Sequence, residues 1–178
     1  MNSGGRNVSQ PPSPASARPG ARGWIARWWP ALLWAALISS FSTGTFTDEK
    51  TGAVIIPILH WLLPKASHHT LLLLHHIIRK TAHFVEYFIF SLLILRAIRA
   101  GRRDTRLRWA LAAIVIVAGY ASLDEFHQSF VPGRTPAISD VLLDTTGGMA
   151  AQAIAGLVLL WGHVRERQNR RKQDVPGG

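Results

Sequence analysis

The stretch LLLLHHIIRKTAHFVEYFIFSLLIL, residues 71–95, is apolar over most of its length but carries a polar insert. About 20 mainly apolar residues are enough for a helix to cross a bilayer. Polar side chains inside such a helix are costly in lipid, so they face the protein interior or a water-filled cavity and mark a functional region by default. The insert consists of His75, His76, Arg79, Lys80, His83 and Glu86. The stretch therefore predicts a membrane-spanning helix that carries a polar site.

Three further segments, residues 24–41, 107–123 and 141–161, have the length and composition of membrane helices. Residues 53–64 are apolar but too few to span, which favours a short interfacial or re-entrant helix. A signal peptide is the alternative for residues 24–41, but no A-x-A-like cleavage site follows and the tryptophans at its start are typical of an interface anchor. We predict an all-α polytopic membrane helical bundle with about four transmembrane helices plus the short helix.

Length and composition exclude several classes of protein. The chain has 178 residues, 48% of them hydrophobic, a formal net charge of +10 and no cysteine. The length allows one domain. The absence of cysteine excludes disulfide scaffolds, thiolate metal sites and a cysteine nucleophile. A nucleic-acid-binding protein would spread its basic residues over a polar surface, whereas here they lie in three bursts between apolar blocks, so no nucleic acid is expected as a partner.

The positions of lysine and arginine predict the topology. Fifteen of the 20 lie in the N-terminal region, the connection between residues 95 and 109, and the C-terminal region, whereas the intervening parts hold five. Because cytoplasmic loops are enriched in these residues, both termini are expected in the cytoplasm. The expected domains are a disordered cytoplasmic tail (1–23, rich in Ser, Pro, Gly and Arg), a transmembrane domain (24–162) and a basic cytoplasmic tail (163–178).

The acidic residues are distributed in the opposite sense. Seven of the ten fall on the predicted extracytoplasmic side, which has a net charge of −2. Five of these seven, at the outer ends of the spans, outnumber the three nearby cations, which are Arg79, Lys80 and Arg134. At low dielectric such a surplus requires a proton, a protonated His83, a cation or a cationic ligand. This is the strongest physical indication of function.

Helical periodicity brings polar residues of three spans to matching faces. One stripe of residues 71–95 contains His76, Lys80, His83, Tyr87 and Ser91, with Arg79 and Glu86 on its flank. Asp124 and Gln128 form an i, i+4 pair, and Asp140 and Asp144 share a stripe with Gly147, where small residues let a neighbouring helix approach closely. The three stripes predict one polar pocket at the extracytoplasmic membrane surface. The Pro-Gly turn signal that follows Phe130 would hold Arg134 at its rim, where it could clamp a carboxylate or phosphate.

Three runs of residues resemble a known family over about residues 30–162. They are Arg79-Lys80-x-x-His83-Phe84-x-Glu86-Tyr87, Asp124-Glu125-x-x-Gln128-x-Phe130-x-Pro132-Gly133-Arg134 and Asp140-x-x-x-Asp144-x-x-Gly147. This chain is similar to the VanZ-like family of bacterial integral membrane proteins. The resemblance implies a protein of the bacterial inner membrane and, for some members, a link to resistance to the glycopeptide teicoplanin. It carries functional roles to the matching residues of this chain, although the family more often has Asn at the position of Asp144.

The predicted site follows from the helical periodicity of the polar residues together with the family resemblance. We assign catalytic roles to His83, Glu86, Asp124 and Glu125, and substrate binding to Lys80, Tyr87, Gln128, Arg134, Asp140 and Asp144. His83 and Glu86 could form an acid–base pair or two metal ligands, but a dimetal bundle would offer Glu-x-x-His from two helices, and only one reversed copy occurs. No metal is assigned, and the cofactor is left open.

The function expected from this site is action on a cell-envelope or lipid-linked substrate, such as a peptidoglycan precursor, with membrane lipids as partners. Two alternatives stay open. The same cluster could serve a non-enzymatic binding or transport protein, or it could be a purely structural polar network that locks the bundle. The sequence does not decide whether the protein is an enzyme.

Overall fold

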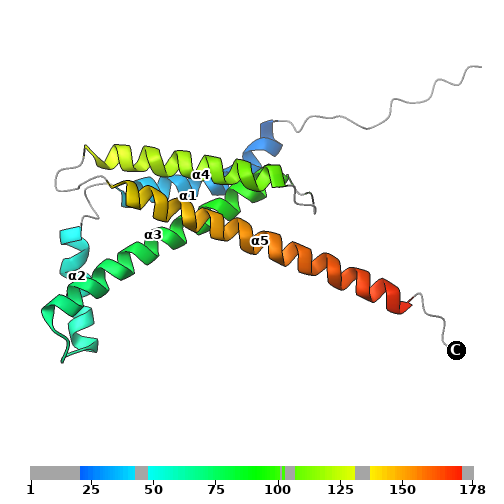
Figure 1. The fold of residues 1–178 in the computed structure, drawn as a ribbon. Helices are drawn as coiled ribbons and strands as arrows, with labels where there is room; N and C mark the ends of the chain where they lie inside the picture. The colour runs from blue at the N-terminus through cyan, green and yellow to red at the C-terminus, as the bar shows by residue number, and fades with distance from the viewer. Residues whose placement is uncertain (1–20, 43–47, 101, 103–106, 131–136, 174–178) are drawn as a thin grey trace, which may run out of the picture.

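The regular structure is helical throughout the part of the chain that the structure describes. The computed structural model describes residues 21–42, 48–100, 102, 107–130 and 137–173. The helices are α1 (Ala21–Phe41), α2 (Asp48–Leu62), α3 (His68–Arg99), α4 (Leu107–Gln128) and α5 (Ile138–Gln173). In Figure 1, α1, α3, α4 and α5 form an elongated bundle, and α2 lies beside the start of α3 at one end. The predicted all-α class is confirmed for these residues.

Three helices are long and apolar enough to cross a membrane, namely α3, α4 and α5 as far as Arg170. The 21 residues of α1 would extend about 32 Å at 1.5 Å per residue, but this helix is not among the three, since it carries four tryptophans and Arg27. The apolar part of α2, Lys50–Leu62, is too short to span. A helical membrane bundle is thus confirmed, whereas the predicted count of four spans is not.

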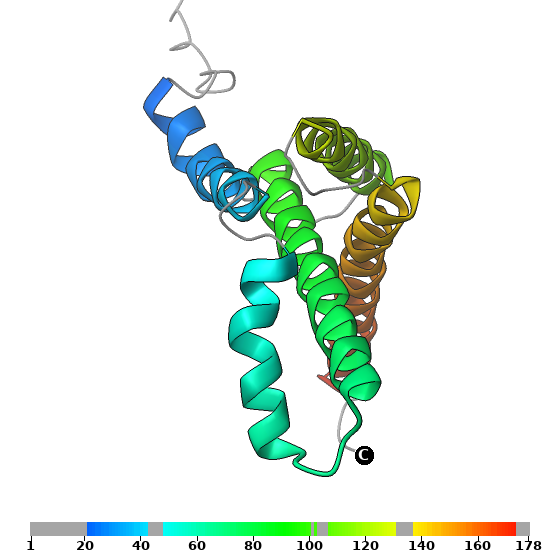
Figure 2. The same cartoon turned by 90° about the vertical axis from the view of Figure 1, so that its left-hand side faces the viewer.

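The central helix is α3, which contacts each of the other four helices. Figure 2 shows it between α1 and α2 on one side and α4 and α5 on the other. Its N-cap is Ser67, whose hydroxyl accepts a hydrogen bond from the N–H of Thr70 at 3.2 Å. Its C-cap is Ala100, which has the left-handed conformation with φ 53°. The predicted span, residues 71–95, lies inside these bounds.

The apolar core lies where α1 and α4 pack on the second half of α3. One seam of α4 contains Ala113, Val117 and Ala121, all fully or almost fully buried and four residues apart. They face Tyr87 and Phe90 of α3 in the same core. By contrast, many large apolar side chains are exposed on the outer faces of the helices, as expected of a bundle whose solvent is lipid.

Two glycines set the distance between α5 and its neighbours. A Cβ atom at Gly147 would overlap the carbonyl oxygen of Phe84 in α3, and one at Gly148 would lie 2.8 Å from Cγ1 of Val117 in α4. Small residues of this kind let helix backbones approach closely in membranes. The contact places the first turns of α5 directly against α3, which brings the acidic residues before Gly147 into the bundle.

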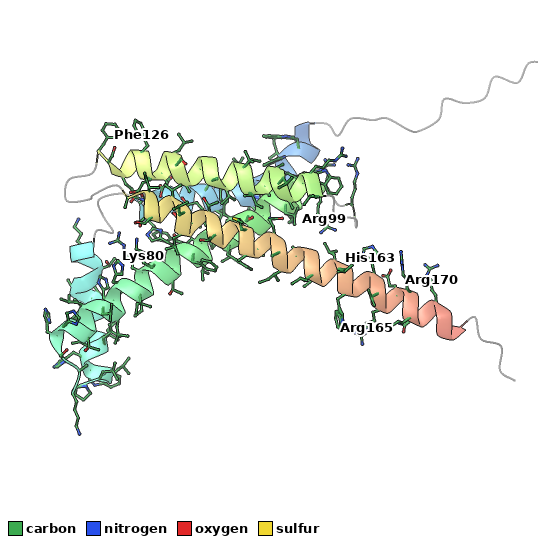
Figure 3. All side chains as sticks on the ribbon, viewed as in Figure 1. Lys80, Arg99, Phe126, His163, Arg165 and Arg170 are labelled. Carbon is green, nitrogen blue, oxygen red and sulfur yellow. The ribbon has the colours of Figure 1, made fainter. Side chains whose placement is uncertain are left out.

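The two ends of the bundle differ in charge. We call the end where α4 stops and α5 begins the acid-rich end, since Asp124, Glu125 and Asp140 lie there, and the end where α3 stops and α4 begins the basic end. Beyond the basic end, α5 continues as a helix past residue 161, where the predicted span stops. Figure 3 shows His163, Arg165 and Arg170 on this projecting segment. The predicted basic tail thus begins as helix, whereas most of the predicted N-terminal tail, residues 1–20, lies outside the described residues.

The close contact at Gly147 can be tested with a pair of glycine substitutions. Gly147→Ala is expected to lower the stability of the folded protein by about 1–3 kcal/mol, because the added methyl group forces α5 away from the backbone of α3. Gly156→Ala is the control, since nothing lies within 4 Å of a Cβ atom at Gly156 and alanine favours the helix. Thermal unfolding in detergent measures both. Equal unfolding temperatures for the two variants would contradict the packing described above.

Candidate functional site

The predicted site residues that the structure describes gather at the acid-rich end. From α3 come Lys80, His83, Glu86 and Tyr87, from α4 Asp124, Glu125 and Gln128, and from α5 Asp140 and Asp144. The five acids among them are named the acid cluster. Asp144 lies near its centre, because the charges of the other four carboxylates all act on it. Arg134 lies outside the described residues. The structure thus brings nine of the ten residues together, while the roles assigned to them stay predictions.

An ion pair joins α3 to α5 at the rim of the cluster. The ammonium group of Lys80 donates a hydrogen bond to Oδ1 of Asp140, and the hydroxyl of Ser139 donates to the same oxygen at 3.2 Å. The side chains of Lys80 and Asp140 are 28% and 23% exposed. Lys80 is visible at this position in Figure 3, where α3 passes the start of α5. One acid of the cluster therefore has a direct cationic partner.

Asp124 is held by hydrogen bonds from two helices. This carboxylate is buried, and its Oδ2 accepts from the hydroxyl of Ser42 at 2.6 Å and from the amide of Gln128 at 2.8 Å. The amide of Gln128 also lies 3.2 Å from the hydroxyl of Ser42. Ser42 follows the last residue of α1, so the first helix also contributes to the site. Ser42 was not among the predicted site residues, and its signal in the sequence is its place with Ser39 and Ser40 at the end of an apolar segment.

Among the described residues, the buried polar atoms without a hydrogen-bond partner include Oδ1 of Asp144 and the hydroxyl of Tyr87 at this site, and Oε1 of Gln152 deeper in the bundle. Tyr87 is fully buried, and its ring packs against Phe90 and Tyr120 with centroids 6.4 Å away in each case. An unsatisfied buried polar group costs about 1–3 kcal/mol. The centre of the cluster can therefore accept a proton or the polar atoms of a ligand.

His83 lies between carboxylates of two helices. Its Nδ1 is 3.8 Å from Oε2 of Glu86, one turn further along α3, and the charge of His83 also acts on Asp140 in α5. A separation of 3.8 Å is longer than a hydrogen bond, so the contact with Glu86 is electrostatic. The imidazole ring of His83 therefore lies next to a carboxylate of its own helix, as the predicted acid–base pair requires.

Glu125 connects α4 to α5. Its Oε1 accepts a hydrogen bond from the backbone N–H of Ala137 at 2.6 Å, at the residue before α5 begins. A carboxylate near a helix N-terminus is stabilised by the free N–H groups there and by the helix dipole. Glu125 thus holds the start of α5 against the end of α4.

A second polar layer lies deeper in the bundle. The amide of Gln152 in α5 donates to the hydroxyl of Ser91 at 2.7 Å and to its carbonyl oxygen at 3.1 Å. The hydroxyl of Ser91 donates in turn to the carbonyl oxygen of Gly148 at 3.0 Å. Ser91 belongs to the predicted stripe, whereas Gln152 was missed, although a lone amide inside an apolar segment is itself a signal.

The cluster can be reached from the side between α1 and α4. A cavity of about 360 Å³ is lined by Ser39, Ser40, Tyr120, Leu123, Asp124 and His127. The hydroxyl of Tyr120 donates to the carbonyl oxygen of Ala35 at 2.6 Å and lies 2.6 Å from the hydroxyl of Ser39, which closes the cavity towards the core. Among the described residues, no group of three or more His, Asp or Glu side chains is arranged to hold a metal ion.

The part of the chain that forms this site matches a known protein family. A family model described as VanZ/LLP1 matches residues 27–159. The chain belongs to the VanZ/LLP1 family. The matched region extends from α1 into α5 and includes every site residue named above, and it confirms the resemblance predicted for about residues 30–162. No curated protein and no solved structure matches the chain significantly.

The unequal surroundings of two acids in α5 lead to a testable difference. Asp140→Asn is expected to lower stability by about 1–2 kcal/mol, because the ammonium group of Lys80 loses its charged partner. Asp144→Asn is expected to leave stability unchanged or to raise it, because it removes a buried carboxyl group from among four others. Thermal unfolding at pH 7 measures the two variants, and a loss of stability in Asp144→Asn as large as that in Asp140→Asn would contradict this account.

Proposed function

We propose that the acid cluster handles the polar head group of a lipid-linked cell-envelope substrate at the extracytoplasmic surface of the bacterial inner membrane. The observation that carries the proposal is a surplus of acid in which Asp124 and Asp144 are buried and Oδ1 of Asp144 is unsatisfied among the described residues. Five carboxylates lie with Lys80, Arg79 and His83 at one end of the bundle, and Oδ1 of Asp144 is buried without a partner among the described residues. A head group rich in hydroxyl, amide or amino donors supplies the protons that these oxygens need.

The orientation of the bundle follows from its charges. Arg96, Arg99, Arg102 and Arg108 lie at the basic end, which the positive-inside rule places in the cytoplasm. The acid-rich end then faces the opposite side of the membrane, where lipid-linked precursors of the cell envelope are used. If α1 is a fourth span, both termini are cytoplasmic.

In the proposed chemistry, different residues bind the anionic group of the substrate, transfer a proton and orient the head group. Lys80, together with Arg134, binds an anionic group of the substrate, because both side chains are suited to phosphate and carboxylate. His83 takes a proton from a hydroxyl or amine of the head group, and Glu86 stabilises the resulting imidazolium. Asp124 is fixed by Ser42 and Gln128, so it can orient the head group. Glu125 keeps α5 in position, and Tyr87 and Asp144 accept or donate hydrogen bonds at the centre.

Two histidine variants, His83→Ala and its control His69→Ala, test the proposal in cells. His83→Ala in an otherwise wild-type chain is expected to reproduce the phenotype of a deletion strain, both in its lipid-linked envelope intermediates and in its tolerance of teicoplanin. The physical reason is that loss of a proton-transferring group slows a reaction by about 10²–10⁴-fold. His69→Ala is the control, since His69 is an exposed histidine of the same helix. The readouts are mass spectrometry of extracted lipids and growth in teicoplanin.

Two results would overturn the proposal. One is full complementation by His83→Ala and by Asp124→Asn at wild-type protein levels. The other is a deletion strain whose lipid intermediates and teicoplanin tolerance equal those of the parent. Either result would show that the cluster does not act on a lipid-linked envelope substrate.

A second candidate function is transport or ligand binding without chemistry. The layer of Ser91 and Gln152 favours it, because these groups extend the polar interior from the acid cluster towards the basic end. Incubation of the purified protein with a polyprenyl-diphosphate-linked sugar separates the two functions. A product of altered mass that His83→Ala does not form indicates an enzyme, whereas binding without a change in mass, lost in Asp124→Asn, indicates a binding or transport protein.

A further inference from the structure

A cavity lies between the ends of α1 and α4, next to the acid cluster. Its volume is about 360 Å³, near the lower limit of ordinary ligand sites. Ser39, Ser40 and His127 line it with exposed polar side chains, whereas Asp124, on its inner side, is buried. Because Asp124 also belongs to the acid cluster, a ligand in this cavity contacts the cluster directly.

The cavity opens to the side of the bundle. The helices α1 and α4 pack against α3 from different sides (Figure 2), and polar side chains bridge their ends. The bridging pairs are Ser39 with Tyr120, Ser42 with Asp124 and Ser42 with Gln128. Deeper in the bundle, Ile38 and Val117 share the apolar core, which closes the space between the two helices. The exposed lining residues, which also include Leu123, therefore mark an opening at the acid-rich end.

The depth of this opening corresponds to the head groups of membrane lipids. The helix α4 has the length and composition of a membrane span, and its 22 residues extend about 33 Å at about 1.5 Å per residue. The hydrocarbon core of a bilayer is about 30 Å thick. The residues of α4 that line the cavity lie between 120 and 127, in its last turns. In the orientation proposed above, they lie at the extracytoplasmic boundary of the hydrocarbon.

Exposed apolar side chains continue from the opening towards the middle of the membrane. Leu33 lies two turns before Ser40 on the same face of α1 and is 54% exposed. Ile116 lies two turns before Leu123 on the same face of α4 and is 39% exposed. Both are nearer to the basic end than the cavity is. A lipid chain that follows these side chains from the opening therefore points into the bilayer.

The inner side of the cavity favours groups that donate hydrogen bonds. An ionised carboxylate accepts hydrogen bonds and cannot donate them. The carboxylate of Asp124 is held in place by Ser42 and Gln128. Like charges repel each other, so a phosphate is disfavoured beside Asp124, whereas the hydroxyl and amide groups of a sugar can donate to it. The cavity thus fits the sugar part of a lipid head group better than its phosphate.

We propose that the cavity between α1 and α4 admits the head group of the lipid-linked substrate sideways from the extracytoplasmic leaflet and binds its sugar part against Asp124, while the hydrocarbon chain stays in the bilayer. This inference rests on the proposed function and adds to it the direction of entry and the part of the head group that is recognised. It also gives α1 a role, since Ser39 and Ser40 line the cavity and Ser42 holds Asp124.

Photolabelling of two matched serine variants tests the inference. The probe is a polyprenyl-diphosphate-linked sugar with a diazirine on the sugar, in phosphatidylcholine nanodiscs that contain the full-length protein. It is expected to label the ends of α1 and α4. Ser40→Trp fills the cavity and is expected to reduce this labelling at least fivefold, whereas Ser122→Trp leaves it within twofold of wild type. The control is matched, because each serine is exposed and donates to the carbonyl oxygen four residues earlier, at 2.7 Å and 2.8 Å.

Two further comparisons complete the experiment. Leu123→Trp, with Val115→Trp as its control, repeats the test in α4 in case Ser40→Trp does not fold, since Leu123 lines the cavity and Val115 is 70% exposed on the same helix. The same diazirine sugar diphosphate without a lipid chain is expected to label the two helices at least fivefold less than the lipid-linked probe, because no chain holds it at the membrane.

Three results would overturn the inference. The first is equal labelling of Ser40→Trp and Ser122→Trp. The second is equal labelling by the chain-free sugar diphosphate, which indicates entry from water. The third is equal labelling by a phosphatidylglycerol with the diazirine in its head group, which indicates surrounding bilayer lipid.

The variant His83→Ala separates this test from that of the proposed function, because His83 does not line the cavity. The expected labelling together with full complementation by His83→Ala refutes the proposed function alone. Loss of complementation in His83→Ala together with equal labelling of Ser40→Trp and Ser122→Trp refutes the further inference alone.

Discussion

The contact of Gly147 with the backbone of Phe84 is the constraint on which the arrangement of the site depends. Asp144 and Asp140 lie three and seven residues before Gly147, so all three occupy one face of α5. Once Gly147 touches α3, both acids must face α3, and there they meet Lys80 and Glu86. A larger residue at this position would separate the helices and weaken the ion pair between Lys80 and Asp140. The cluster is therefore a consequence of helix packing as much as of the acids themselves.

The carboxylates of the acid cluster differ in how many hydrogen-bond or ion-pair partners they have, and this difference bears on whether the cluster has a functional or only a structural role. Asp124 accepts two hydrogen bonds, Asp140 has Lys80, and Glu125 has the N–H of Ala137. Oδ1 of Asp144 is buried without a partner among the described residues. A network that served only to lock the helices together would gain stability by pairing each member, because an unsatisfied polar group in a membrane interior costs several kcal/mol. Local departures from good pairing are expected where a ligand or a proton completes the arrangement.

Helical periodicity predicted that the acid-cluster residues of α3, α4 and α5 share facing sides of their helices, because a repeat of 3.6 residues determines the face on which each side chain lies. The contact of Ser42 with Asp124 could not be predicted, since it joins positions 82 residues apart and depends on how α1 packs. The continuation of α5 to Gln173 was also missed, because hydropathy marks the membrane-embedded stretch and not the end of a helix. Arginine and glutamine are good helix formers, so the basic segment after residue 161 extends the same helix.

The ion pair of Lys80 and Asp140 lies at the rim of the proposed substrate site and joins α3 to α5. A phosphate or carboxylate of the substrate that reaches Lys80 competes with Asp140 for the same ammonium group. In the proposed function, arrival of such an anionic group therefore releases the carboxylate of Asp140, which can then accept a hydrogen bond from the head group.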